Sequence, residues 1–246
     1  MIHISLKSEK IFDLYGLPFT NSLILSVIVL IASLLAFVYY SYLIKSKSKN
    51  IFYYFMTFLL RALYNLFKSI FNDKVSGFFP LVGAFFFFIL IHNELGLFPG
   101  VGSILINVGS YSEKHFVPLL RGGTTDLNTT FALALITVIY AQYIGIKILG
   151  VKEYFKKFLN FSSVTAFFVG LMETISEFSR IISYSFRLYG NIFAGEVVIA
   201  IMAFLFPLLL SFPFLLFEIF VGIIQALVFS MLSAVFYNLA MQKAHY

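Results

Sequence analysis

Residues 164–210 read VTAFFVGLMETISEFSRIISYSFRLYGNIFAGEVVIAIMAFLFPLLL, with no proline before Pro207. About 20 apolar residues are enough for a helix to cross the hydrocarbon core of a bilayer, so this stretch is much longer than one perpendicular crossing requires. A second long apolar stretch, residues 214–243, follows Pro213, and each proline lacks the N–H donor that a continuing helix needs. The sequence therefore predicts a helical hairpin in the membrane, with strongly tilted helices.

The composition of the whole chain agrees with a membrane environment. Of the 246 residues, 61% are hydrophobic and 11% are charged, and the mean hydropathy is +0.96. A water-soluble fold would leave too much of this apolar surface exposed to water. The absence of cysteine excludes disulfides, thiolate metal sites and cysteine nucleophiles. The predicted fold class is therefore an all-α integral membrane protein, with no metal site, no cofactor and no nucleic-acid partner.

Three other hydrophobic stretches are long enough to span the membrane. They comprise residues 22–44, 78–97 and 131–149. Together with the two helices of the hairpin, they predict about five transmembrane helices in a single membrane domain, residues 1–246.

Residues 51–73 form a different kind of helix in this prediction. Arg61, Asn65, Lys68 and Asn72 follow one another at offsets of four, three and four, so they share one helical face. A helix with one polar face is suited to lie in the membrane interface rather than to cross the bilayer. The alternative is a poorly hydrophobic transmembrane span.

Lysine and arginine are concentrated in two linkers, residues 45–74 and 147–157. These linkers lie on the same side of the membrane if two spans separate them, and the positive-inside rule places that side in the cytoplasm or its equivalent. The turn between the hairpin helices then faces the opposite side. We call the two sides inner and outer.

Arg187 lies in FRLYGNIFAGE, residues 186–196, within a stretch that is apolar enough to lie in a bilayer. Its guanidinium stays charged at any accessible pH, and holding it at membrane depth costs about 2.5 to 3.5 kcal/mol or more. Glu173, Arg180 and Arg187 are spaced by seven residues and share one helical face, which Asn191 extends. A charge in this position needs a partner or a function.

The carboxylates of the hairpin fall into two groups. Glu196 lies nine residues after Arg187, which is roughly 180° around the helix and about 13 Å further towards the outer turn. An antiparallel hairpin can bring Glu196 and Glu218 together at the outer side, while Glu173 and Glu177 lie at the inner side. Carboxylates inside membranes typically line proton or ion routes. The pattern predicts two polar entrances separated by a fixed cation, with a moving carboxylate on another protein.

Simpler interpretations exist for several of these residues. Arg180 could extend its guanidinium to the interface or pair with Glu177 and Glu173, and the two carboxylates could be the solvated end of a long helix. Asp126 and Asn128 are suited to cap the span that begins near residue 131.

At these residues the chain resembles subunit a of the F-type rotary ATP synthase. Arg187, Asn191 and Glu196 match the family's motif within FRLYGNIFAGE, and Glu218 and Gln225 match it within FEIFVGIIQALVFSMLSAVF, residues 217–236. NELGLFPG, TTDLNTTFALAL and the positions of a glutamate and an arginine at 173 and 180 add support. The resemblance covers most of the chain from residue 93 onwards.

Two positions depart from the pattern of the family. Some members carry a histidine where this chain has Glu218, an exchange that keeps a titratable group but changes its charge. Some members carry an acidic residue where this chain has Gly96, and this departure argues against a role for the neighbouring Glu94 at the outer entrance.

The resemblance implies a non-catalytic stator subunit that lies against a ring of c subunits. Protons would enter past Glu196 and Glu218, protonate a ring carboxylate and leave near Glu173, with Glu177, Arg180, Asp126 and Asn128 as possible accessory residues. Arg187 would hold the ionised ring carboxylate and separate the two half-channels. Gln225 would be its close neighbour.

The implied partners are the c-ring, b-type peripheral stalk subunits, the rest of the ATP synthase and membrane lipid. The expected location is the bacterial plasma membrane, with the mitochondrial inner membrane as the alternative, and sodium is the alternative to the proton as the coupling ion. A self-contained ion channel or secondary transporter is the alternative function. Transporters typically contain inverted repeats and broken helices, and the sequence contains no convincing repeat.

Overall fold

The computed structural model describes residues 8–14, 17–98, 101, 104–107, 116–158, 163–206 and 211–242. Within these ranges five helical stretches are long and apolar enough to cross a membrane, with residues 51–96 counted as one stretch. The predicted class, an all-α integral membrane protein, is confirmed. The helices are α1 (Asn21–Lys45), α2 (Ile51–Phe71), α3 (Val75–Gly96), α4 (Leu127–Leu149), α5 (Val151–Lys156), α6 (Val164–Leu205) and α7 (Ser211–Ala240).

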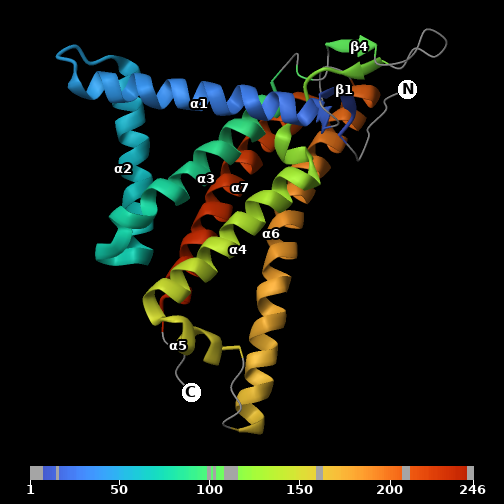
Figure 1. Ribbon diagram of the computed structural model, residues 1–246. Helices are drawn as coiled ribbons and strands as arrows, with labels where there is room; N and C mark the ends of the chain where they lie inside the picture. Colours follow the sequence, from blue (N-terminus) through green and yellow to red (C-terminus); the bar gives the residue numbers. More distant parts are fainter. Residues whose placement is uncertain are drawn as a thin grey trace.

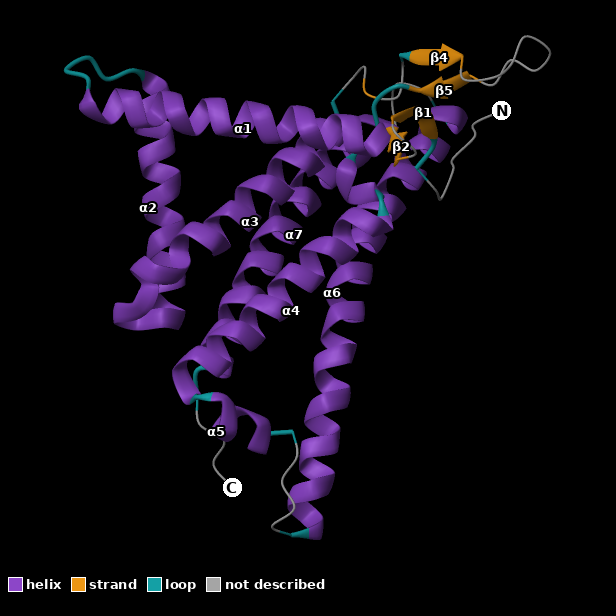
Figure 2. Ribbon diagram, viewed as in Figure 1, coloured by secondary structure: helices purple, strands orange, loops and turns teal. Residues whose placement is uncertain are grey.

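Short strands accompany the helices. β1 (Lys10–Leu14) pairs with β2 (Leu17–Thr20), and β4 (Leu105–Asn107) pairs with β5 (Phe116–Pro118), both antiparallel. Figure 2 shows both pairs at the end of the molecule where α1 and α4 begin. The end of α6 and the beginning of α7 also lie at this end, whereas α5 and the end of α7 lie at the opposite end (Figure 1). The first end corresponds to the predicted outer side.

Helix α2 has the one-sided pattern that the sequence predicted. Leu63, Phe67 and Phe71 are buried, whereas Arg61 and Lys68 are exposed. The helix runs across the direction of α1 in Figure 1, and α3 leads back from its end at an angle. The reversal occurs at Asn72, whose φ of 50° lies in the left-handed region that asparagine tolerates better than most residues. The placement of α2 in the membrane interface stays a prediction.

Helix α6 is shorter than the predicted range 164–210, and α7 begins and ends three residues earlier than the predicted range 214–243. Helix α6 ends at Leu205, two residues before Pro207, because a proline disfavours helical geometry in the residue that precedes it. Helix α7 begins at Ser211, so Pro213 lies in its first turn, where an N–H would have no intrahelical acceptor. Pro207 and Lys243 lie outside the described residues.

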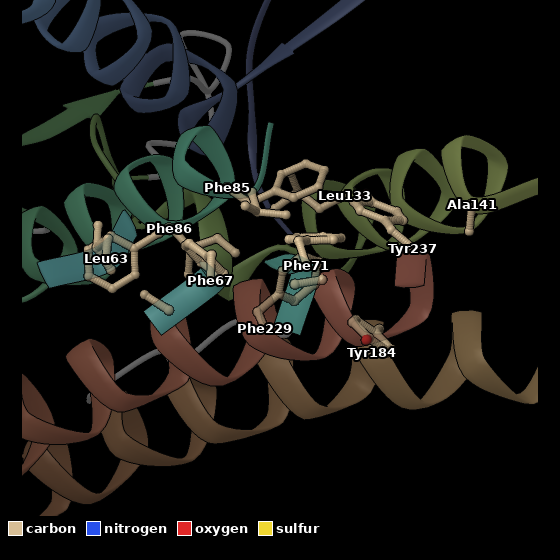
Figure 3. Close-up of a cluster of buried hydrophobic side chains, with 14 of the residues drawn as sticks. Leu63, Phe67, Phe71, Phe85, Phe86, Leu133, Ala141, Tyr184, Phe229 and Tyr237 are labelled. Atoms are coloured by element: carbon tan, nitrogen blue, oxygen red, sulfur yellow. The ribbon is translucent and has the colours of Figure 1, made fainter. Parts of the chain in front are cut away.

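Aromatic side chains form much of the core between α2, α3, α4, α6 and α7 (Figure 3). Phe229 of α7 makes edge-to-face contacts with Phe85 of α3 and Tyr184 of α6, at centroid distances of 5.7 and 5.1 Å. Tyr237 of α7 contacts Tyr140 of α4 in the same manner at 5.1 Å. These contacts lock α7 against its neighbours and fix the relative positions of the polar groups on α6 and α7.

Candidate functional site

Arg187 lies on the side of α6 that the rest of the chain leaves uncovered. Its Nη2 donates to Ser183 Oγ at 3.3 Å, one turn earlier on the same helix. The neighbouring side chains of Ile182 and Phe186 are 57% and 56% exposed. Among the described residues, no carboxylate lies within ion-pair distance of this guanidinium. The structure thus presents a permanent cation on a largely apolar, exposed helix face.

Asn191 and Gln225 join the two hairpin helices one turn outward from Arg187. Asn191 Nδ2 donates to Gln225 Oε1 at 2.9 Å. Gln225 is only 4% exposed, and its Nε2 has no hydrogen-bond partner in the described part of the chain. Gln225 is therefore hydrogen-bonded to Asn191, whereas the resemblance implied Arg187 as its close neighbour.

The outer carboxylates come from different helices of the hairpin. Glu218 of α7 is 3% exposed, and its carboxyl group lies directly over Gly195 of α6. A Cβ at Gly195 would lie 1.9 Å from the carboxyl carbon of Glu218, so this position of the carboxyl group requires glycine at 195. Glu196 follows Gly195 in the chain, and its Oε2 is buried with no hydrogen-bond partner among the described residues.

A cavity of about 510 Å³ extends between the outer and central parts of the hairpin. Glu218 lines it near the outer turn, and Asn191 and Gln225 line it towards Arg187. The rest of its wall is mainly apolar, with contributions from Ala194, Gly195, Val198, Ile199, Phe214, Phe217, Val221 and Ile224. The hairpin thus contains a space that connects the outer carboxylate with the amide pair next to Arg187.

The inner carboxylates are paired with basic groups. Glu173 lies 2.8 Å from Lys157 and 3.8 Å from Arg180. Arg180 also lies 2.6 Å from Glu177, and its guanidinium lies 4.5 Å from the ring centre of Phe236. The structure therefore agrees with the interpretation in which Arg180 pairs with Glu177 and Glu173. The sequence analysis did not single out Lys157 for this network.

Tyr154 of α5 extends the inner network from outside the membrane-spanning helices. Its hydroxyl donates to Gln142 of α4, and its ring lies against Gly145. Burial, together with the nearby carboxylates of Glu177 and Glu173, raises the pKa of Tyr154 to about 12. The hydroxyl therefore stays protonated at neutral pH and acts as a hydrogen-bond donor. A cavity of about 240 Å³ lies beside this network, lined by Gln142, Thr174, Glu177 and their apolar neighbours.

Asp126 and Asn128 lie at the start of α4. Asp126 Oδ1 accepts from the backbone N–H of Asn128 at 2.9 Å, and Oδ2 accepts from Ser8 at 2.6 Å and Ser22 at 2.7 Å. Burial alone would raise the pKa of Asp126, but these three hydrogen bonds and the charge of Arg121 outweigh burial and hold its pKa below the usual value. The geometry is that of a helix cap that also fastens the N-terminal segment.

Sequence reasoning missed a second group of polar residues near the outer carboxylates. Arg121 is 7% exposed, donates to Thr125 Oγ1 at 3.2 Å and interacts electrostatically with Glu196. Asn93 is 1% exposed and donates to the carbonyl of Gly222 at 3.0 Å. Arg121 directly precedes the polar run GGTTD, but its proximity to Glu196 depends on chain folding over 75 residues and has no local signal.

Membrane-length helices with ionisable groups at both ends of one hairpin define a multi-pass integral membrane protein. The model of the family described as ATP synthase A chain matches residues 22–238, and the chain belongs to this family. It is thus a subunit of the membrane sector of the ATP synthase complex and a multi-pass protein of the plasma membrane.

Several bacterial proteins named ATP synthase subunit a are similar to this chain. The protein of Geotalea daltonii is 32% identical over 78% of this chain and 75% of its own length. That of Syntrophobacter fumaroxidans is 33% identical over 78% of this chain and 72% of its own length. That of Desulforamulus reducens is 36% identical over 68% of this chain and 58% of its own length.

Proposed function

We propose that this chain is the non-catalytic, proton-translocating stator subunit of a rotary ATP synthase, and that it forms two offset half-channels against a ring of c subunits. The observation that carries the proposal is the exposed guanidinium of Arg187 between two separate carboxylate groups. One group contains Glu196 and Glu218, and the other contains Glu173 and Glu177. Neither group is in ion-pair contact with Arg187 within the described ranges.

The outer half-channel uses the cavity between α6 and α7. A proton that enters at Glu196 and Glu218 follows the 510 Å³ cavity to Asn191 and Gln225, one turn from Arg187. The amide pair has hydrogen-bonding groups but no titratable group, so it can orient water without retaining the proton. This path ends at the exposed face of α6, where a ring carboxylate would take up the proton.

The inner half-channel begins on the other side of Arg187. A ring carboxylate that has made almost a full turn would release its proton towards Glu173 and Glu177. Lys157 and Arg180 hold these two carboxylates in place at the inner end, where the carboxylates would accept the proton and pass it to water. Arg180 is thus an accessory residue, whereas Asp126 and Asn128 have structural roles as a helix cap.

Arg187 separates the two routes by its charge. It attracts the ionised carboxylate of a passing c subunit and repels protons and other cations, which prevents a continuous leak. Because a guanidinium does not lose its proton at accessible pH, the barrier is present at all times. The driving free energy includes about 2.3 kcal/mol per charge for each 100 mV of membrane potential.

The test of this proposal uses the complete ATP synthase in membrane vesicles. Arg187→Ala is expected to abolish ATP-driven proton pumping while the subunits still assemble, and Arg61→Ala on the exposed side of α2 serves as the matched control. Retained pumping in Arg187→Ala would refute the assigned role. Reconstitution of this chain alone tests the other class of function, because ion conduction or solute transport without the ring would identify a self-contained channel or transporter.

A further inference from the structure

Glu94, near the C-terminal end of α3, faces the hairpin at the level of the outer carboxylates. Its Oε1 is buried without a hydrogen-bond partner among the described residues. This oxygen lies 3.1 Å from the position that a Cβ of Gly222 would occupy. Gly222 lies one helical turn after Glu218 on α7, so both carboxyl groups lie along the same face of this helix. The two groups are close enough to interact electrostatically.

Two buried acceptors at this end of the hairpin have no donor among the described residues. Glu218 Oε1 and Asn93 Oδ1 are both buried and have no hydrogen-bond partner in the described part of the chain. Asn93 Nδ2 is already used, since it donates to the Gly222 carbonyl. None of the ion pairs between described residues includes Glu94 or Glu218.

Other ionisable groups at this end interact with different partners. Arg121 interacts with Glu196 and with Asp126. His92 directs Nδ1 to the Phe88 carbonyl at 3.0 Å and Nε2 to Ser26 Oγ at 3.0 Å. The fully ionised pair would therefore carry two negative charges at close range without a neutralising cation in ion-pair contact, an unfavourable arrangement in a buried site.

One bound proton removes this difficulty. A protonated carboxyl group becomes a donor, and the carboxylate opposite is the acceptor that it requires. Uptake of the proton forms one O–H bond and reduces the charge of the pair from two negative charges to one. Transfer to the next acceptor breaks that O–H bond, so the step is a proton transfer with no oxidant or reductant.

We propose that Glu94 and Glu218 share one proton at the outer end of the hairpin, which makes Glu94 a second proton-holding residue of the outer half-channel. This inference rests on the proposed function of that half-channel. It also reverses the sequence expectation, which argued against Glu94 from the glycine at position 96. Gly96 packs against Gly122, because a Cβ at position 96 would lie 3.4 Å from the Cα of Gly122. Positions 94 and 96 therefore face different neighbours.

The experiment measures ATP synthesis by the complete enzyme in liposomes, as a function of the pH on the outer side of subunit a. For Glu94→Gln we expect the half-maximal pH to move down by about one unit or more, because a lone carboxyl group retains its proton less well than a coupled pair. Glu94→Asp keeps a carboxyl group and should restore most of the wild-type dependence of ATP synthesis on pH. Asp13→Asn, an exposed acidic residue at the same end, is the matched control and should leave the profile unchanged.

The coupling between the two residues is tested by a double variant. If the two residues share a proton, the double variant Glu94→Gln/Glu218→Gln should synthesise ATP no more slowly than the single variant Glu218→Gln. If the two single replacements reduce the rate of ATP synthesis equally and their effects multiply in the double variant, the shared proton is refuted. If Glu94→Gln reduces assembly, the pH profile is measured on the assembled fraction, and a half-maximal pH equal to that of the wild type overturns the shared proton.

Two further outcomes separate the explanations. An unchanged profile in Glu94→Gln, with pumping lost in Arg187→Ala, would refute the role of Glu94 and leave the proposed function intact. Retained pumping in Arg187→Ala would refute the proposed function itself. A synthesis rate that depends on sodium at constant pH, and loses this dependence in Glu94→Gln, would assign the site to a bound cation and overturn the shared proton.

Discussion

At the inner end of α6, Glu173 and Glu177 both lie within ion-pair distance of basic side chains. At the outer end, Glu196 and Glu218 each keep one buried oxygen without a hydrogen-bond partner in the described ranges, although Arg121 interacts electrostatically with Glu196. The carboxyl groups at the two ends of one hairpin thus differ in their partners: basic side chains at the inner end and, among the described residues, buried and unpaired oxygens at the outer end. In the proposed function the outer end takes up protons and the inner end releases them.

The difference between the two ends depends on the space available at Gly195, so the largest effect is expected for Gly195→Val. Its Cβ would lie 1.9 Å from the carboxyl carbon of Glu218 and would displace this carboxyl group from its position between the hairpin helices. We expect complete loss of ATP-driven proton pumping in membrane vesicles. Gly77→Ala is the control, since a Cβ there meets no atom within 4 Å. Normal pumping in Gly195→Val would show that the close approach is not required.

Replacement of one carboxyl group at each end compares the two groups directly. Glu196→Gln removes a titratable group of the outer route, and proton pumping should fall about 100-fold, the usual scale for loss of a positioned proton-transfer group. Glu177→Gln leaves Arg180 with Glu173 as a remaining partner, so a loss of only a few-fold is expected. Pumping rates that fall equally in both variants would contradict the proposed difference between the ends.

Asp126 affects the stability of the outer end rather than proton transfer. Asp126→Ala removes an acceptor of three hydrogen bonds and should lower the free energy of unfolding by about 3 kcal/mol, with Asp73→Ala as an exposed control. Because folding lowers the pKa of Asp126, its stabilisation is present above the unfolded pKa of about 3.9 and is lost as pH falls through the folded value. Thermal unfolding of the wild type and Asp126→Ala should therefore converge below about pH 4.

The smallest effect is expected for Tyr154→Phe at the inner end. This change removes one hydrogen bond to Gln142, worth about 1 kcal/mol, and leaves the ring in place. Proton pumping should fall less than a few-fold, and its pH profile between about pH 6 and 9 should not change, because the hydroxyl has a pKa of about 12. Tyr143→Phe, an exposed tyrosine of α4, is the control. A changed pH profile would indicate that Tyr154 itself exchanges protons.

The long-range part of the outer site could not be predicted from local patterns. Helical periodicity indicated that Glu196 points away from Arg187 and that Glu218 and Gln225 share a face, because both follow from 3.6 residues per turn. Periodicity within one helix says nothing about which residue of another helix lies opposite. The contact of Glu94 with Gly222 joins residues 128 positions apart, and the glycine at position 96 had argued against a role for Glu94 at the outer entrance.

The sequence by itself determined the membrane class, the hairpin and the spacing of Arg187 between two groups of carboxylates, because hydrophobicity and helical period are local properties. Only the tertiary structure decided how these groups are partnered. Lys157 reaches Glu173, Asn191 binds Gln225, and Glu218 lies over Gly195. These contacts depend on how side-chain volumes fit between packed helices, and that fit is a property of the whole bundle.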